Sequence, residues 1–125
     1  RVVVYPLTRA AARTLPDDGL VVTRFPLRIG RAAAGTEPEP TDLNDLWLLD
    51  DRPFNVSRNH CAIDLTRHGV VVRDRGSQLG CIVNDTRVGG PAPLPAAALH
   101  PGHNVLVLGG PMSPYQFRVT VGAAG

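Results

Sequence analysis

Short apolar runs separated by turn residues follow one another along most of the chain, and this pattern predicts β strands. Residues 25–31 are the clearest example, because Phe25, Leu27 and Ile29 alternate with other residues as in a half-buried strand. Regular short strands without a long helical period favour an all-β fold, a sandwich of two antiparallel sheets with about eleven short strands. The other short runs rich in Val, Ile, Leu or aromatic residues are 2–7, 20–22, 42–49, 60–65, 69–73, 81–84, 104–108 and 115–121.

Three segments do not fit the strand pattern. Residues 9–15 could form one helical turn, which the turn sequence Pro16-Asp17-Asp18-Gly19 would end. The proline-rich segment 89–99 cannot be a central strand, because proline removes a donor from the ladder. We predict a crossing loop there, with a short turn of helix at residues 96–98. Residues 32–41 are predicted to be a surface loop.

The length of 125 residues fits one domain. We expect residues 1–19 to be an N-terminal strand and turn that belong to the sandwich or lead into it. The sandwich itself is expected over residues 20–121, and residues 122–125 are expected to be a linker. Because the chain begins with arginine and not with methionine, we expect it to be a piece of a longer protein.

Charge and cysteine content narrow the function. The chain has 13 arginines, no lysine and a net charge of only +2, which is too small a surplus for a general nucleic-acid-binding surface. The absence of lysine is typical of a GC-rich genome, and we expect a bacterial one. Cys61 and Cys81 lie in no C-x-x-C pair and the four histidines have no zinc spacing, so neither a metal nor another cofactor is expected. Two cysteines without a predicted disulfide fit a reduced, cytoplasmic setting. No apolar run approaches the ~18 residues of a membrane span.

Polar residues gather in three predicted loops: Gly30-Arg31, residues 57–60, and residues 74–80. Loops at one end of a sandwich converge in space although they are far apart in sequence. Together they would supply guanidinium groups, a hydroxyl, an amide and backbone N–H groups, with no evident base. Such donors suit an anion, and arginine can hold two oxygens of a phosphoryl group at once.

These residues also resemble a known family. In order along the chain stand Gly30-Arg31, then SRNHCAI at 57–63, then DRGSQLGCIVN at 74–84. The forkhead-associated (FHA) domain has Gly-Arg, then Ser-Arg-x-His-Ala-x-Ile, then Ser-x-Asn-Gly-Thr-x-Val-Asn-Gly. Order and approximate spacing agree, and the resemblance covers about residues 20–121.

The resemblance implies a β sandwich that binds phosphothreonine peptides through loops at one end. It implies that Arg31 contacts the phosphate or the peptide near it, and that Ser57 gives the phosphate a hydroxyl bond. Arg58 would add a charge-assisted bond, and Gln78 matches a position that often donates to the phosphate. His60 would bond loop backbone through its ring nitrogens. The residues expected to support the site structurally are Gly30, His60, Gly80 and Asn84.

Three positions depart from the family pattern. Leu79 stands where the family has an asparagine that bonds the backbone of the bound peptide, a bond worth roughly 0.5–1.5 kcal/mol. Leucine cannot make that bond but offers an apolar contact to the peptide. Cys81 replaces a threonine and Asp85 a glycine, although Asn84-Asp85 still suits a tight turn. Arg75 is either a second-rank neighbour of the phosphate or a solvated loop charge.

We therefore expect a phosphothreonine-dependent binding module of a larger signalling or regulatory protein, monomeric as an isolated domain. Its partner would be a phosphothreonine protein or a phosphorylated segment of the same chain. No enzyme is expected, since paired carboxylates, a metal cluster and a nucleophile–base pair are not evident. The alternative is a module that has lost phosphopeptide binding and serves as a phospho-independent interaction or oligomerisation surface, which Leu79 favours.

Overall fold

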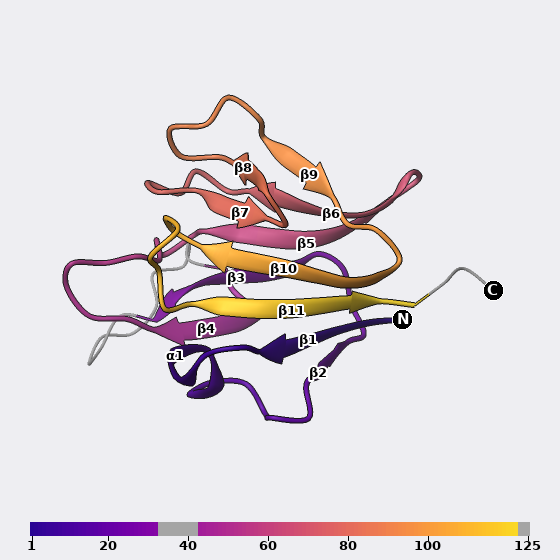
Figure 1. The fold of residues 1–125 in the computed structure, drawn as a ribbon, viewed down its shortest axis with the longest axis horizontal. Helices are drawn as coiled ribbons and strands as arrows, with labels where there is room; N and C mark the ends of the chain where they lie inside the picture. Colours follow the sequence, from indigo (N-terminus) through magenta and orange to yellow (C-terminus); the bar gives the residue numbers. More distant parts are fainter. Residues whose placement is uncertain (33–42, 123–125) are drawn as a thin grey trace.

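The computed structural model describes residues 1–32 and 43–122, and within these residues eleven strands form two sheets (Figure 1). The six-stranded sheet has the order β2-β1-β11-β10-β7-β8, and the five-stranded sheet the order β4-β3-β5-β6-β9. The elements are β1 Val2–Pro6, α1 Arg9–Ala12, β2 Leu20–Val22, β3 Leu27–Ala32, β4 Leu46–Leu49, β5 Cys61–Thr66, β6 Gly69–Asp74, β7 Cys81–Val83, β8 Thr86–Val88, β9 Ala96–Ala98, β10 Gly102–Leu108 and β11 Gln116–Val121.

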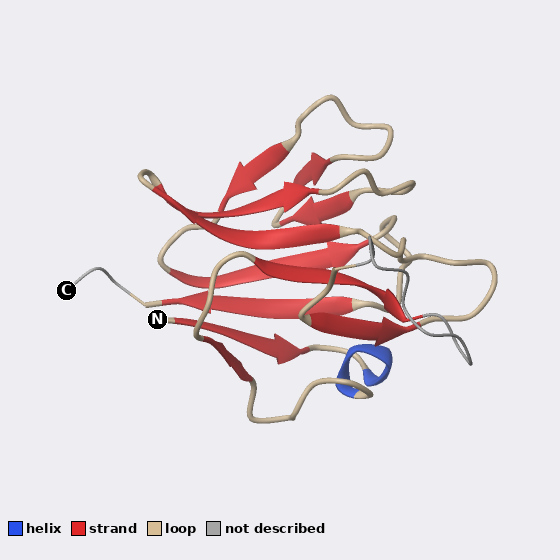
Figure 2. Cartoon of the chain, turned by 180° about the vertical axis from the view of Figure 1, so that it is seen from behind, coloured by secondary structure: helices blue, strands red, loops and turns tan. Residues whose placement is uncertain are grey.

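The prediction of an all-β sandwich with about eleven short strands is confirmed. Figure 2 shows how little helix the described chain contains, and α1 falls within the predicted helical turn. One pairing differs from the expected antiparallel arrangement, because β4 runs parallel to β3. A parallel pair cannot be joined by a two-residue hairpin, and β4 begins at Leu46, well after β3 ends at Ala32.

The turn of helix predicted at residues 96–98 is wrong. These three alanines form β9, which pairs antiparallel with β6. β9 lies at the edge of its sheet, where one side of the backbone needs no ladder partner, so the neighbouring prolines are tolerated. Alanine has a high helix propensity, but pairing with β6 overrides that local preference.

The core lies between the sheets and follows the alternation of each strand. On β6, Val70 and Val72 are buried, whereas Arg73 is exposed. Phe117 on β11 is the largest fully buried side chain among the described residues. Cys61 and Cys81 belong to the same core and are unbridged, as expected of small buried hydrophobic residues.

The loops that carry the predicted site lie together at one end of the sandwich. The 50–60 loop enters β5, and the 75–80 loop crosses from β6 in one sheet to β7 in the other. Both lie at the left in Figure 1, and the chain enters β1 at the opposite end. The predicted loop 32–41, apart from Ala32 in β3, and residues 123–125 of the predicted linker lie outside the described residues. In the described part, no helix has the length and apolar character needed to cross a membrane.

Candidate functional site

The site begins at Gly30 on β3, where two loops approach the backbone closely. A Cβ atom on residue 30 would lie 1.8 Å from the carbonyl oxygen of Arg58, far inside van der Waals contact. The side chain of Asn44 fills the adjacent space, and its Nδ2 donates to the same carbonyl at 2.7 Å. Glycine at residue 30 therefore allows the strand, Asn44 and the 50–60 loop to meet at one point.

Arg31, the next residue of β3, is fastened to the 50–60 loop. Its backbone N–H donates to the carbonyl of Ser57 at 2.9 Å, and its Nε donates to the carbonyl of Val56 at 2.9 Å. Its guanidinium carbon also lies 3.7 Å from the centre of the Phe54 ring, within the range of a cation–π contact. These contacts hold the guanidinium group of Arg31 beside the backbone of Ser57.

His60 joins the loop of Ser57 to the loop that precedes β7. Its Nδ1 accepts a hydrogen bond from the Ser57 N–H at 2.9 Å, and its Nε2 lies 2.8 Å from the Gly80 carbonyl oxygen. Because Nδ1 accepts and Nε2 faces an acceptor, the proton of the neutral ring sits on Nε2. The ring is fully buried, and burial lowers the pKa of His60 while the bond to Gly80 offsets part of that effect.

This buried ring predicts that the protein loses stability in mild acid. The folded pKa of His60 is below its ordinary value of 6.5, so the stabilisation is complete above pH 6.5 and is lost as the pH falls through the folded pKa. Protonation would also put a donor on Nδ1 against the Ser57 N–H. We expect the melting temperature to fall between pH 7 and pH 5.

A matched variant separates this effect from the other histidines. His68, His100 and His103 are all exposed, and their triple replacement by glutamine should preserve the fall in melting temperature. Loss of the pH dependence in the triple variant would contradict the assignment to His60.

The 74–80 loop is shaped by hydrogen bonds within itself. The Asp74 carboxylate accepts from the Gly76 N–H at 2.9 Å and from the Ser77 hydroxyl, and the Ser77 Oγ in turn accepts from the Gly80 N–H at 3.0 Å. Gly80 has a φ of +75°, and a Cβ there would lie 2.5 Å from the Val88 carbonyl oxygen. Glycine is thus required at residue 80 both for its backbone conformation and for its packing.

Ser57 and Gln78 meet where the two loops face one another. The Ser57 Oγ accepts a hydrogen bond from the backbone N–H of Gln78 at 3.0 Å. The side chain of Gln78 is exposed, and so is that of Arg58, whereas Ser57 is half-buried. The structure thus brings Arg31, Ser57 and Gln78 into one connected group. Arg58 is the next residue after Ser57 in the sequence.

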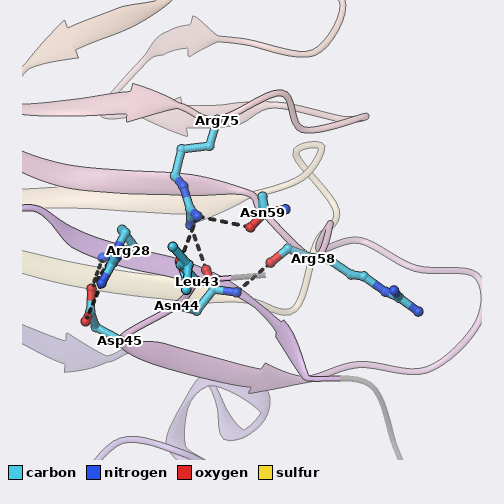
Figure 3. A network of polar contacts seen from close by, with 7 residues as sticks. All are labelled: Arg28, Leu43, Asn44, Asp45, Arg58, Asn59 and Arg75. Carbon is cyan, nitrogen blue, oxygen red and sulfur yellow. Dashed lines mark hydrogen bonds and ion pairs between the residues drawn. The ribbon is translucent and has the colours of Figure 1, made fainter. Parts of the chain in front are cut away.

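Arg75 belongs to a polar network that supports the same end of the molecule (Figure 3). Its guanidinium group donates to the Asn44 Oδ1 at 2.6 Å, to the Leu43 carbonyl at 2.7 Å and to the Asn59 Oδ1 at 3.0 Å. Arg75 is therefore half-buried and bonded within the protein, unlike a solvated loop charge. In Figure 3 the side chain of Arg58 points away from this network.

Asn84 is not brought to the site. It follows β7, whereas Gly80 precedes that strand, so the two lie at opposite ends of β7. Asn84 has a φ of 55° in its tight turn, and its Oδ1 accepts from the Val105 N–H at 3.0 Å. Its structural role is to tie this turn to β10.

Leu79 is 43% exposed and borders an apolar groove with a volume of about 370 Å³. The far wall is the 89–94 loop, which packs directly on the 78–80 segment, because a Cβ on Gly90 would lie 2.5 Å from the Gly80 nitrogen. The groove therefore adjoins the group formed by Arg31, Ser57 and Gln78. Its other lining residues include Ile82, Arg87, Pro91, Pro93 and Leu94.

Four residues that support the site have no role predicted from the sequence: Asn44, Phe54, Asp74 and Ser77. Asp74 and Ser77 were foreseeable, since Asp-x-Gly-Ser is a pattern in which a carboxylate bonds nearby backbone N–H groups. Asn44 and Phe54 gave no such local sign, because each contacts residues distant in sequence. Among the described residues, no group of three or more His, Cys, Asp or Glu side chains could hold a metal ion.

Comparison with known proteins places the chain in a family. The family model of the FHA domain matches residues 27–106, which include every loop described above. The chain belongs to the FHA domain family. A search of curated protein sequences found no match to the chain.

Solved structures agree on the FHA fold. The FHA domain of the CT664 protein from Chlamydia trachomatis is 20% identical, with a TM-score of 0.63 over 98% of this chain and 99% of that one. Mycobacterium tuberculosis EmbR in complex with a low affinity phosphopeptide is 23% identical, with a TM-score of 0.58 over 98% of this chain and 25% of that one. The yeast Pml1 splicing factor is 20% identical, with a TM-score of 0.60 over 98% of this chain and 79% of that one.

Proposed function

We propose that this FHA domain is a phosphothreonine-dependent binding module whose site is the loop end of the sandwich. The observation that carries the proposal is the connected group of Arg31, Ser57 and Gln78, in which two hydrogen bonds fix donors from three separate segments. The EmbR structure, which shares the fold, holds a phosphopeptide, and this supports the same class of ligand here.

The donors of this group suit a phosphate dianion. The Ser57 Oγ accepts from the Gln78 N–H, so its own proton is available to donate to a phosphate oxygen. Arg31 and Arg58 supply planar guanidinium groups that complement phosphate oxygens and charge. The exposed side-chain amide of Gln78 adds a neutral donor.

Arg75 has a different part in the proposal. Its guanidinium group is bonded to Asn44 and Asn59, and Asn44 in turn holds the carbonyl of Arg58. Asp45, next to Asn44, is anchored to β3 by its ion pair with Arg28, with 3.0 Å between Nε and Oδ2. We assign Arg75 the role of positioning the Arg58 segment and not that of touching the phosphate.

Titration calorimetry with a phosphothreonine peptide library tests the proposal. Charge-assisted bonds contribute about 1.5–3 kcal/mol each and are offset by the cost of association, so we expect an affinity no better than about micromolar. Each peptide is compared with its phosphoserine and unphosphorylated twins. Equal binding of the phosphorylated and unphosphorylated sets, or binding of neither, would contradict the proposal.

Leu79→Asn tests what the departure at this position does to peptide recognition. Asparagine can bond the peptide backbone, and a hydrogen bond of about 0.5–1.5 kcal/mol predicts an affinity up to about tenfold tighter. Leu65→Asn is the matched control, because Leu65 is 56% exposed but lies on β5 towards the opposite end. If Leu79→Asn binds the peptide more weakly while Leu65→Asn binds it as the wild type does, the peptide contacts the apolar groove through Leu79 and gains nothing from a backbone hydrogen bond there.

The second candidate is a phospho-independent interaction or oligomerisation surface. Exposed Leu79 and the groove beside it favour this function, since an apolar groove offers contact area without requiring charge. It predicts that Arg31→Ala leaves partner capture unchanged, whereas phosphate binding predicts a large loss.

The proposal extends to the setting of the domain. We place it in a larger signalling or regulatory protein, as a monomeric module without catalytic activity of its own. Two buried, unbridged cysteines are consistent with a reducing compartment, and we assign the domain to the cytoplasm. The ligand would be a phosphothreonine in a partner protein or in another segment of the same chain.

A further inference from the structure

The ring of Phe54 brings a second arginine close to Arg31. The guanidinium carbon of Arg31 lies 3.7 Å from the ring centre, and that of Arg52 lies 5.4 Å from it. An aromatic ring attracts each cation, but the two like charges repel one another. Phe54 thus keeps the positive charge of Arg52 near that of Arg31.

The loop that carries Arg52 is stabilised by the carboxylate of Asp50, which bonds backbone of the same loop. Asp50 accepts hydrogen bonds of 2.7–2.9 Å from three backbone N–H groups of its own loop. The ion pairs found between described residues involve Arg28 and Arg73, and neither includes Arg52. The donors to Asp50 are the N–H groups of Asp51, Asn55 and Val56.

The spacing of the two arginines fits an extended peptide. Because both carbons lie near one ring centre, they are at most about 9 Å apart. In an extended chain, residues two apart point to the same side and are separated by about 7 Å. Two anionic side chains in that relation can each face one of the guanidinium groups.

We propose that Arg52, with Phe54 as the ring that positions it beside Arg31, binds a second anionic side chain two residues from the phosphothreonine. The second group is an aspartate, a glutamate or another phosphorylated residue of the same peptide. This inference rests on the proposed function and names the kind of peptide that the site selects. Arg52 thereby determines sequence specificity, while Arg31 faces the phosphothreonine.

The test compares three phosphothreonine peptides that differ only at the positions two residues before and two residues after the phosphothreonine. The first has alanine at both positions. The second has glutamate at the earlier position, and the third has glutamate at the later one. Each is titrated against the wild-type domain, Arg52→Gln and Arg67→Gln. Arg67 is exposed in the hairpin between β5 and β6 at the opposite end, so its variant carries the same change in net charge. Thermal melts establish that both variants are folded.

We expect one of the glutamate peptides to bind the wild-type domain about 2- to 5-fold tighter than the alanine peptide, as for an exposed ion pair. A second phosphate at that position should strengthen binding further, and added salt should shrink the difference. Arg52→Gln should bring the ratio of the two Kd values close to one, and Arg67→Gln should preserve it.

Equal binding of all three phosphopeptides, or a glutamate preference that survives in Arg52→Gln, would overturn this inference and leave phosphothreonine binding standing. Failure of every phosphopeptide to bind better than its unphosphorylated twin would overturn the proposed function as well.

Discussion

Gly30→Ala is expected to destabilise the fold strongly. The new methyl group would lie 1.8 Å from the Arg58 carbonyl oxygen and 2.6 Å from the Asn44 Nδ2. Backbone has to move to make room, and overpacking of this kind costs at least the usual 1–3 kcal/mol. We expect a loss of about 3 kcal/mol or more, with a melting temperature lower by about 10 °C or more.

Gly110→Ala is the control for this prediction. Apart from the neighbouring residues 109 and 111, a Cβ on residue 110 would meet no described atom within 4 Å, and the φ of Gly110 is not positive. Its replacement should therefore change stability by no more than about 0.5 kcal/mol. Denaturant unfolding of both variants measures the difference. A Gly30→Ala protein as stable as Gly110→Ala would show that the close approach of the loops is not needed.

Arg31→Ala should abolish most of the binding to a phosphothreonine peptide. The substitution removes a guanidinium group that its contacts with Val56 and Phe54 hold next to Ser57. Loss of a preorganised charged anchor costs about 2 kcal/mol or more, a factor of about 30 in Kd. Calorimetric titration of the variant with the phosphopeptide and its unphosphorylated twin measures this loss.

Two further variants keep that result interpretable. Arg31→Lys retains the charge but not the planar fork of donors, so its affinity should lie between those of the wild type and Arg31→Ala. Arg67→Ala removes an exposed arginine at the opposite end and should bind as the wild type does. Undiminished binding by a folded Arg31→Ala protein would favour the phospho-independent surface.

The strands could be predicted from the sequence where alternation was strong. The alternation of Phe25, Leu27 and Ile29 predicts a strand, and the structure has β3 there, although β3 begins only at Leu27. Proline correctly excludes the segment before β9 from the centre of a sheet. The alanines of β9 misled the prediction because their local preference is helical, while pairing with β6 is decided by tertiary structure.

The hydrogen-bond donors of the loop site could be predicted from the sequence, but the residues that hold these donors in place could not. Arg31, Ser57 and Gln78 stood in recognisable motifs, and the structure connects them through hydrogen bonds. Phe54 and Asn44 reach the site only through long-range folding, and no periodicity or turn pattern records such contacts. The prediction that Asn84 supports the site fails for a similar reason. Asn84 is close to the site residues in sequence, but β7 separates it from them, so it lies at the other end of that strand.

The most direct test of phosphate recognition at the loop end is an NMR titration that follows the backbone amide signals. On addition of a phosphothreonine peptide, the signals of Arg31, Ser57 and Gln78 should shift, while those of the 66–69 and 84–85 turns stay in place. The unphosphorylated twin should shift none of them. Shifts centred on the two turns, or equal shifts with both peptides, would contradict the account.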